Sequence, residues 1–166
     1  MPRKPEAPLS FESLSEYACA KLLEKYTGWK GCEGVSFQIP IGRAVFDFRV
    51  GDTLVEYHPI SLRREFLTDG LRDIMPIVHR LNRRSKLQIL EALAQELAAQ
   101  YDKRRSQTLA AHAPHGECSL ICAHTPEEFI KNVVYRFADK RCPNMAQMLH
   151  EFRALQREFN KRRDRR

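Results

Sequence analysis

Three segments between residues 35 and 58 alternate apolar and polar side chains, and this period of two predicts β-strands. They cover residues 35–39, 44–50 and 53–58. We expect Pro40 to end the first strand and short turns at Gly42 and at Gly51-Asp52 to join the three. Two hairpins in succession predict an antiparallel meander.

Other segments repeat apolar residues every three or four positions, which predicts amphipathic helices. Ser10 is the expected N-terminal cap of the first helix, and Thr125 is the expected cap of a later helix that begins at Pro126. Residues 118–123 are expected to form a fourth strand. The expected helices cover residues 10–26, 62–82 in one or two pieces, 85–107, 126–137 and 144–160.

The order of elements is therefore α-β-β-β-α-β-α, with a helical stretch inserted after the third strand and one more helix at the end. The chain has 166 residues, which is enough for one domain with a proper core and a helical appendage. This order predicts an α/β protein.

Composition narrows the class of protein further. With 43% hydrophobic and 30% charged residues, the chain resembles soluble globular proteins. It has no apolar run near the ~18 residues that a membrane span needs, and its first residues lack the apolar stretch of a secretory signal. We therefore expect a cytoplasmic protein with no membrane partner.

Positive charge is unevenly distributed along the chain. The formal net charge is +7, and residues 151–166 carry seven basic side chains against three acidic ones. Such a surplus favours polyanions, of which nucleic acid is the commonest. A solvated helix end with a frayed tail fits the same charges, so charge alone leaves both interpretations open.

A group of possible zinc ligands near the fourth strand does not favour a zinc site. Cys118 and Cys122 lie four positions apart on a predicted strand, which separates them by ~13 Å, too far to share one tetrahedral ion. The sequence also has no CxxC pair. In a cytoplasmic protein, five scattered cysteines are expected to be reduced and mostly structural. The zinc-ligand residue types in question are His112, His115, Cys118, Cys122 and His124.

Two acidic residues lie in otherwise apolar strands. Asp47 stands between two phenylalanines, and Glu56 follows Leu54-Val55. A two-residue hairpin would bring Asp47 and Glu56 close together across the ladder, and strict alternation would place Phe46 and Phe48 on one face and Asp47 on the other. Two carboxylates can hold Mg²⁺, or Mn²⁺, and the ion can activate water. His58 shares the face of Glu56 and could accept a proton or add a ligand.

An ion pair is the other interpretation of these acids. Buried carboxylates need compensation, and Arg43, Arg49 or another base could provide it instead of a metal. Spacing alone leaves this alternative open.

Several short motifs resemble the PD-(D/E)XK nuclease superfamily, and within it the very-short-patch-repair endonuclease and its uncharacterised bacterial relatives. The first motif is the run Phe37-Gln-Ile-Pro-Ile-Gly42, followed by Val45-Phe-Asp-Phe48 and Leu54-Val-Glu56. The second is an Asp-x-x-Arg-x-x-x-Leu helix signature formed by Asp102, Arg105 and Leu109, which precedes the fourth strand.

The resemblance implies a restriction-endonuclease-like αβββαβ core with a mixed central sheet flanked by helices. It implies that Asp47 and Glu56 are metal ligands and that Glu16, or less favourably Glu12, is an upstream acid. Gln38 and the region of Arg104 and Arg105 would face the active cleft. The expected domains are a Pro-rich, disordered N-terminus (1–9), a nuclease-like domain (10–138) with a helical insertion (60–99), and a basic C-terminal helix and tail (139–166).

The sequence departs from the family pattern at two places. Glu56-Tyr57-His58-Pro59 contains neither the lysine of Glu-x-Lys nor the Asp-Gly of the nearer relatives, and residues 60–99 lengthen a link that is usually short. His58 could take over the lysine's role as a fixed charge, although a neutral imidazole is a weaker substitute near neutral pH.

Basic segments border the expected cleft. We expect Lys103, Arg104 and Arg105 to contact phosphates, and such binding would weaken steeply with salt. For Arg63-Arg64 and for the basic residues between Arg80 and Lys86, phosphate contact and a solvated helix face fit equally well.

Three functions follow, in order of preference. The first is a Mg²⁺-dependent DNA endonuclease or nuclease-like DNA-processing protein. The second is a nucleic-acid-binding module that kept the fold without the activity. The third is a helical interaction protein, in which residues 60–99 and 144–160 form the surface for a second copy or a protein partner.

Overall fold

The computed structural model describes residues 9–60, 75–112 and 118–165. The chain divides into two compact units, one formed by residues 1–58 and 108–166 and the other by residues 59–107. Four of the expectations above fall outside the described residues: the disordered N-terminus up to residue 8, the helix expected from residue 62 as far as residue 74, the Arg63-Arg64 pair, and His115.

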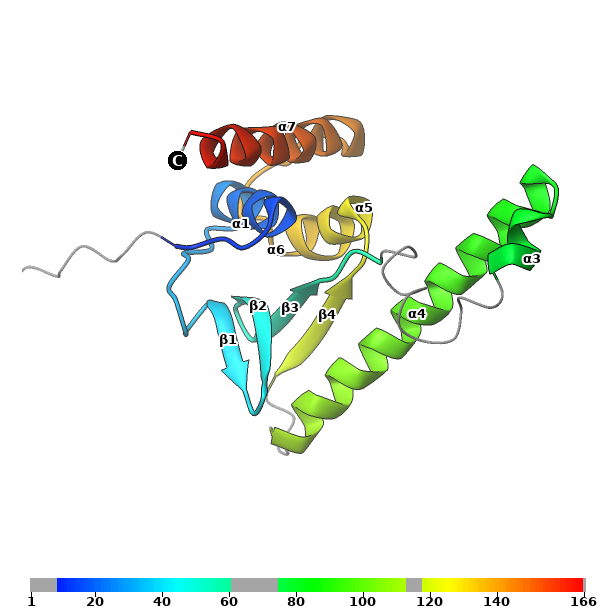
Figure 1. Ribbon diagram of the computed structural model, residues 1–166. Helices are drawn as coiled ribbons and strands as arrows, with labels where there is room; N and C mark the ends of the chain where they lie inside the picture. Colours follow the sequence, from blue (N-terminus) through cyan, green and yellow to red (C-terminus); the bar gives the residue numbers. More distant parts are fainter. Residues whose placement is uncertain (1–8, 61–74, 113–117, 166) are drawn as a thin grey trace, which may run out of the picture. The chain divides into compact units, whose positions relative to one another are not determined.

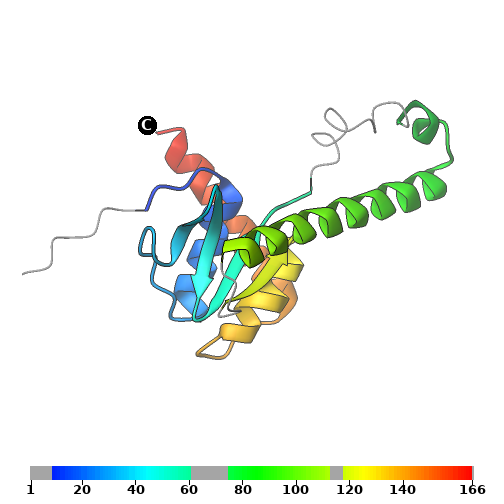
Figure 2. The same ribbon diagram turned by 90° about the horizontal axis from the view of Figure 1, so that it is seen from below.

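The first unit is an α/β structure built on a mixed four-stranded sheet (Figures 1 and 2). The strands are β1 (Phe37–Ile41), β2 (Ala44–Val50), β3 (Thr53–Tyr57) and β4 (Ser119–Ala123), in the spatial order β1-β2-β3-β4. The first three form an antiparallel meander, and β4 runs parallel to β3. The predicted meander and fourth strand are thereby confirmed.

Two-residue turns join the strands of the meander. Each begins with a glycine of positive φ, 62° at Gly42 and 58° at Gly51. Glycine adopts this backbone conformation without steric cost, which is why it starts such hairpin turns.

Strand β1 differs from its prediction at both ends. It begins at Phe37, and Val35, expected in the strand, lies before it with 64% of its surface exposed. It also continues through Pro40 to Ile41. A proline cannot donate to a ladder, but β1 is an edge strand, and there one side of the backbone needs no partner.

Helices cover one face of this sheet in two layers (Figure 1). The inner layer holds α1 (Leu14–Tyr26) and the continuous segment α5 (Pro126–Phe129), π-helical η2 (Ile130–Val134) and α6 (Tyr135–Phe137). The outer layer is α7 (Met145–Arg163), which packs on α1. Because α1 lies between the sheet and α7, it is buried on more than one side.

Apolar side chains form a cluster on each face of the sheet. The larger cluster joins β-strand residues such as Phe37, Phe48 and Val55 to α1, α5, η2 and α7. The smaller one holds Ile39, Phe46 and Leu54 together with Leu109, from the last turn of helix α4 (Arg83–His112).

The second unit contains α3 (Met75–His79) and α4 as far as residue 107. Helix α4 has 30 residues, and both of its ends extend beyond the predicted range of 85–107. Ile77 and Leu87 in this unit are 63% and 57% exposed. Across the described residues, no helix is both long and apolar enough to cross a membrane.

The N-terminal cap was predicted correctly for one helix and wrongly for another. Thr125 caps α5 as expected, because its hydroxyl accepts the Glu128 N–H at 3.1 Å. Helix α1 starts later than predicted, and Ser13 caps it instead of Ser10, with its hydroxyl accepting the Glu16 N–H at 3.1 Å. The spacing Ser-x-x-Glu from Ser13 to Glu16 is that of a capping box.

This difference can be tested by substitution. Ser13→Ala is expected to lower the free energy of unfolding by about 1 kcal/mol, because it removes the acceptor for an otherwise unsatisfied backbone donor. Ser10→Ala removes the same atoms from an exposed serine before the helix and is expected to change stability by less than about 0.5 kcal/mol. Urea unfolding of both variants measures the difference, and equal losses would contradict the observed cap.

Candidate functional site

Asp47 and Glu56 lie next to each other on strands β2 and β3. The antiparallel register pairs Phe48 with Val55, and this places Asp47 across from Glu56. Glu56 Oε2 accepts the backbone N–H of Asp47 at 3.1 Å, and Asp47 Oδ2 accepts the backbone N–H of Tyr57 at 2.8 Å. Each carboxyl group is therefore held by the backbone of the other strand.

Burial makes this pair electrostatically unfavourable. Glu56 is only 1% exposed. Burial raises the pKa of Asp47 well above its ordinary value, the charge of Glu56 raises it further, and the Tyr57 amide opposes both effects. Two negative charges so close in a low-dielectric site are costly unless a proton or a cation joins them.

Gln38 lies opposite Asp47 with an unusual backbone conformation. Its φ is 50°, the only positive φ of a non-glycine residue in the described chain. The register pairs Phe37 with Phe48 and Ile39 with Phe46, so Gln38 and Asp47 face each other between these two pairs. The regular ladder is interrupted where the acid lies.

This interruption corrects the predicted alternation along β2. Phe48 belongs to the cluster on the helix-covered side, whereas Phe46 belongs to the cluster on the opposite face. The prediction that the two phenylalanines share one face is therefore wrong. Strict alternation requires regular extended strands, and the neighbouring strand β1 departs from this geometry at Gln38, opposite Asp47.

Helix α1 brings a third acid to the same place. Gln38 Nε2 donates to Glu16 Oε1 at 3.3 Å, and Glu16 Oε2 accepts the backbone N–H of Glu12 at 2.8 Å. Burial raises the pKa of Glu16, and the charge of Glu16 contributes to the raised pKa of Asp47. The sequence-predicted residues Glu16, Gln38, Asp47 and Glu56 are thus brought together.

Cys19 is a neighbour of the acids that the sequence did not indicate. It is fully buried, and burial raises the pKa of its thiol well above the usual range, with smaller contributions from Asp47 and Glu16. Its spacing of three residues from Glu16 on a helix was the available signal. The buried Cys19 side chain therefore adds an apolar group beside the carboxyl groups.

His58 lies just after the end of β3. Its backbone N–H donates to Ala123 O at 2.9 Å, and its carbonyl accepts a hydrogen bond from His124 Nδ1 at 2.6 Å. The two imidazole rings meet edge to face with centroids 6.4 Å apart. His58 is therefore held in place by the junction between β4 and α5.

Arg49 is a candidate for the alternative ion pair with the buried acids, but the contact that the structure describes for its side chain is with Cys118. Its Nη2 lies 4.0 Å from Cys118 Sγ, and its Nε is buried without a hydrogen-bond partner. Arg43, the other named base, is exposed in the β1–β2 turn. The interactions that shift the pKa of Asp47 come from burial, from Glu56 and Glu16, and from the Tyr57 amide.

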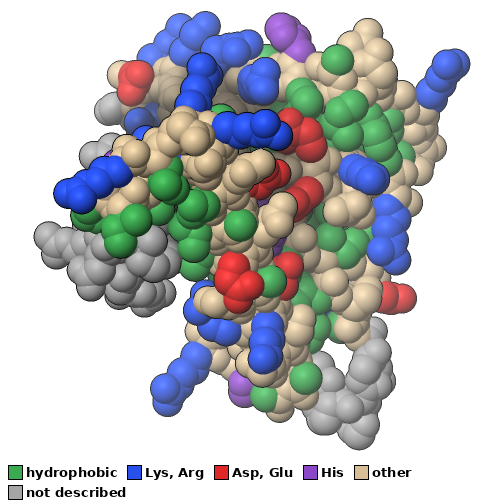
Figure 3. Space-filling view, turned by 90° about the vertical axis from the view of Figure 1, so that its right-hand side faces the viewer, with side chains coloured by type: hydrophobic (Ala, Val, Ile, Leu, Met, Phe, Trp, Pro, Cys, Tyr) green, Lys and Arg blue, Asp and Glu red, His purple; other side chains and the backbone are tan. Residues whose placement is uncertain are grey.

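The expected phosphate-binding residues Lys103, Arg104 and Arg105 belong to the second unit. There, Arg105 Nε donates to Tyr101 Oη at 3.0 Å and its guanidinium lies 5.4 Å from the Tyr101 ring centroid. Their place beside the acidic site stays a prediction. On the surface drawn in Figure 3, Lys and Arg side chains occur at several separate places among acidic and hydrophobic ones.

Metal-binding clusters of the common kind are not found in the described part of the chain, where no three His, Cys, Asp or Glu side chains gather as a ligand group. A cation at the acidic pair would take Asp47 and Glu56 as its protein ligands and complete its shell with other oxygens.

Searches with the whole chain found no match among protein-family models, curated proteins or solved structures.

Proposed function

We propose that this protein is a metal-dependent DNA endonuclease in which Asp47 and Glu56 hold the metal. The observation that carries the proposal is the buried carboxylate pair on β2 and β3, in which burial and then the charge of Glu56 raise the pKa of Asp47. Mutual repulsion of this kind is relieved when a divalent cation binds between the two groups.

The donor set suits Mg²⁺, with Mn²⁺ as a substitute. Mg²⁺ prefers oxygen ligands, keeps several waters, and is commonly bound by one or two carboxylates together with substrate phosphates. When bound, the ion supplies an activated water and neutralises charge on the scissile phosphate. This accounts for a site with two protein ligands, and it agrees with the resemblance to PD-(D/E)XK nucleases.

The neighbouring residues would orient the reaction. Gln38 donates to Glu16 Oε1 and so directs that carboxylate, which lies near enough to Asp47 to affect its pKa. Glu16 can therefore accept hydrogen bonds from water close to the metal ligands. His58, which stands at the lysine position of Glu-x-Lys, would accept the proton of the attacking water. Lys103, Arg104 and Arg105 contact phosphates of the DNA.

One experiment with two variants tests this assignment. Titration calorimetry with Mn²⁺ is expected to show binding to the wild type and little or none to Glu56→Gln, which keeps the shape and removes the charge. His58→Ala is expected to bind Mn²⁺ normally but to cleave plasmid DNA about 10²–10⁴-fold more slowly, the usual contribution of a general base. If the wild type did not bind Mn²⁺, the proposal of a metal-dependent enzyme would be rejected.

A second candidate function is a nucleic-acid-binding module without catalytic activity. The specific observation in its favour is the sequence Glu56-Tyr57-His58, which has no lysine after the second acid. It would gain support if DNA bound at ~50 mM salt, where phosphate contacts are strong, while neither Mn²⁺ binding nor cleavage occurred.

A further inference from the structure

A pocket of about 490 Å³ lies between the segment that precedes α1, helix α1 itself and the C-terminal end of α7. We propose that this pocket binds an unpaired nucleotide of the DNA substrate, and the proposal rests on the function proposed above. Its volume is in the range of small-ligand sites.

Aromatic rings form the interior of the pocket. Phe11 and Phe159 both contact Tyr17, with ring centroids 5.4 Å apart in each case, and Leu9 adds an aliphatic side chain. Tyr17 is only 4% exposed and forms the floor, whereas Phe11 and Phe159 are partly exposed. Partly exposed rings of this kind offer the surface on which an unpaired base can stack.

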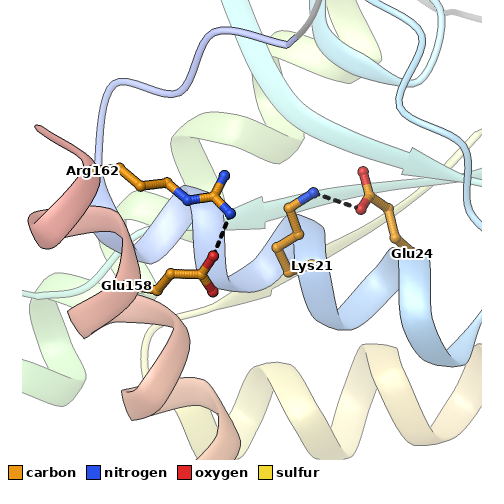
Figure 4. Close-up of polar contacts among 4 residues, drawn as sticks. All are labelled: Lys21, Glu24, Glu158 and Arg162. Carbon is orange, nitrogen blue, oxygen red and sulfur yellow. Dashed lines mark hydrogen bonds and ion pairs between the residues drawn. The ribbon is translucent and has the colours of Figure 1, made fainter. Parts of the chain in front are cut away.

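Three basic residues, together with Glu12 and Glu24, line the pocket around these rings. Lys21 Nζ and the Arg162 guanidinium each lie 5.7 Å from the Tyr17 ring centroid, and Arg163 also lines the pocket. Figure 4 shows Lys21 paired with Glu24 and Arg162 paired with Glu158. The Arg162 side chain is 64% exposed. Because exposed ion pairs are weak, a phosphate group can replace the carboxylate partner.

The pocket adjoins the acidic site through the start of α1. Glu12 lines the pocket, and its backbone N–H donates to Glu16 Oε2 at 2.8 Å. Glu16 in turn is joined to Gln38, which lies opposite Asp47. A nucleotide held in the pocket would therefore lie beside the start of α1, close to the helix that brings Glu16 to the acidic site.

The combination of aromatic rings and cations favours an unpaired nucleotide as the ligand. Proteins that bind single strands combine aromatic side chains that stack on bases with basic residues that follow the backbone. The last turn of α7 supplies such a basic run with Lys161, Arg162 and Arg163. The partly exposed rings and the adjoining carboxylates favour a nucleotide that has left its partner strand over an intact duplex, whose bases are stacked inside.

The test measures binding without cleavage. Fluorescence anisotropy in EDTA compares a labelled oligothymidine, a duplex with a single-stranded overhang and a blunt duplex of equal length. Phe159→Ala is expected to weaken binding of the first two at least about fivefold and to leave the blunt duplex unchanged. For the single strand, Arg162→Ala is expected to make the slope of log affinity against log salt concentration shallower, by the amount that corresponds to about one phosphate contact.

Arg157→Ala is the matched control for Arg162→Ala, because Arg157 is exposed on the same helix and does not line the pocket. It is expected to affect the three DNAs equally and weakly. The proposal is overturned if Arg162→Ala behaves as Arg157→Ala does, or if wild-type protein prefers the blunt duplex.

Two further measurements separate the pocket from the acidic site and guard against misfolding. An iodouracil-substituted oligonucleotide is expected to crosslink to Phe11, Tyr17 or Phe159, and crosslinks confined to other peptides would contradict the pocket. Glu56→Gln is expected to lose Mn²⁺ binding and keep the preference for single strands. If single strands bind but the wild type fails to bind Mn²⁺, the proposed catalysis fails and the pocket stands.

Discussion

Asp47→Asn is expected to lower the rate of Mg²⁺-dependent DNA cleavage by at least about a hundredfold, because a metal contributes several kcal/mol of transition-state stabilisation. The asparagine retains the shape of the side chain and an oxygen that can accept the Tyr57 N–H. It removes one of the two negative charges that attract the cation. Plasmid cleavage at saturating Mg²⁺ measures the loss, and circular dichroism verifies that the variant is folded.

The same variant is expected to stabilise the metal-free protein at neutral pH. Burial and the charge of Glu56 raise the pKa of Asp47 in the folded state, so the folded protein holds this proton more tightly than the unfolded chain does. The stability that this proton contributes is complete below the ordinary carboxyl pKa, and it is lost as pH rises through the raised pKa. Stability of metal-free wild type should therefore fall with rising pH over this window.

Urea unfolding in EDTA from about pH 5 to about pH 8 measures this dependence. Asp47→Asn is expected to flatten the decline, since its side chain does not titrate. The matched control is Asp52→Asn, an exposed aspartate in the β2–β3 turn, which should leave the decline in place. If Asp47→Asn were the less stable protein at the upper end of this range, the like-charge interpretation of the pair would be wrong.

Phe48→Ala is expected to destabilise the protein by about 3–5 kcal/mol, the range found when a buried aromatic side chain is truncated to alanine. Phe48 is 0% exposed. Its ring lies 5.6 Å from Trp29, 5.8 Å from Phe37 and 6.4 Å from Phe129, measured between centroids. The side chain thus joins the sheet to the helix layer, and its loss leaves a cavity that these rings cannot fill without moving.

Val45→Ala is the control on the same strand. Val45 is 50% exposed, so its truncation is expected to change stability by less than about 0.5 kcal/mol. Chemical denaturation, with the midpoint and the slope fitted separately, distinguishes the two variants. A loss below about 1 kcal/mol for Phe48→Ala would mean that the cluster around Trp29 is not well packed.

The sequence by itself determined the features that depend on neighbours along the chain. Period-two alternation and the Gly-initiated turns predicted the meander, and the two-residue hairpin brought Asp47 close to Glu56. The Thr125 cap was predicted for the same reason, because its hydroxyl meets an amide only three residues away. Local sterics and local hydrogen bonds decide such features, so the residues concerned are sufficient to predict them.

Rules that use only neighbouring residues predicted the structure less well where two elements meet. Phe46 and Phe48 belong to different clusters, and Gln38, which lies opposite the residue between them, has a left-handed φ. Nothing in the alternation of β2 indicates either feature. The start of α1 was misplaced because two serines were available as caps, and only Ser13 has Glu16 at the right spacing.

Only the tertiary structure decided which distant residues share a site. Glu16 and Gln38 join Asp47 because α1 packs against the sheet, and Cys19 becomes their buried neighbour for the same reason. The pocket between residues 9–12 and 159–163 exists because α7 packs on α1. These arrangements depend on which apolar surfaces bury one another, a property of the whole chain that no single segment carries.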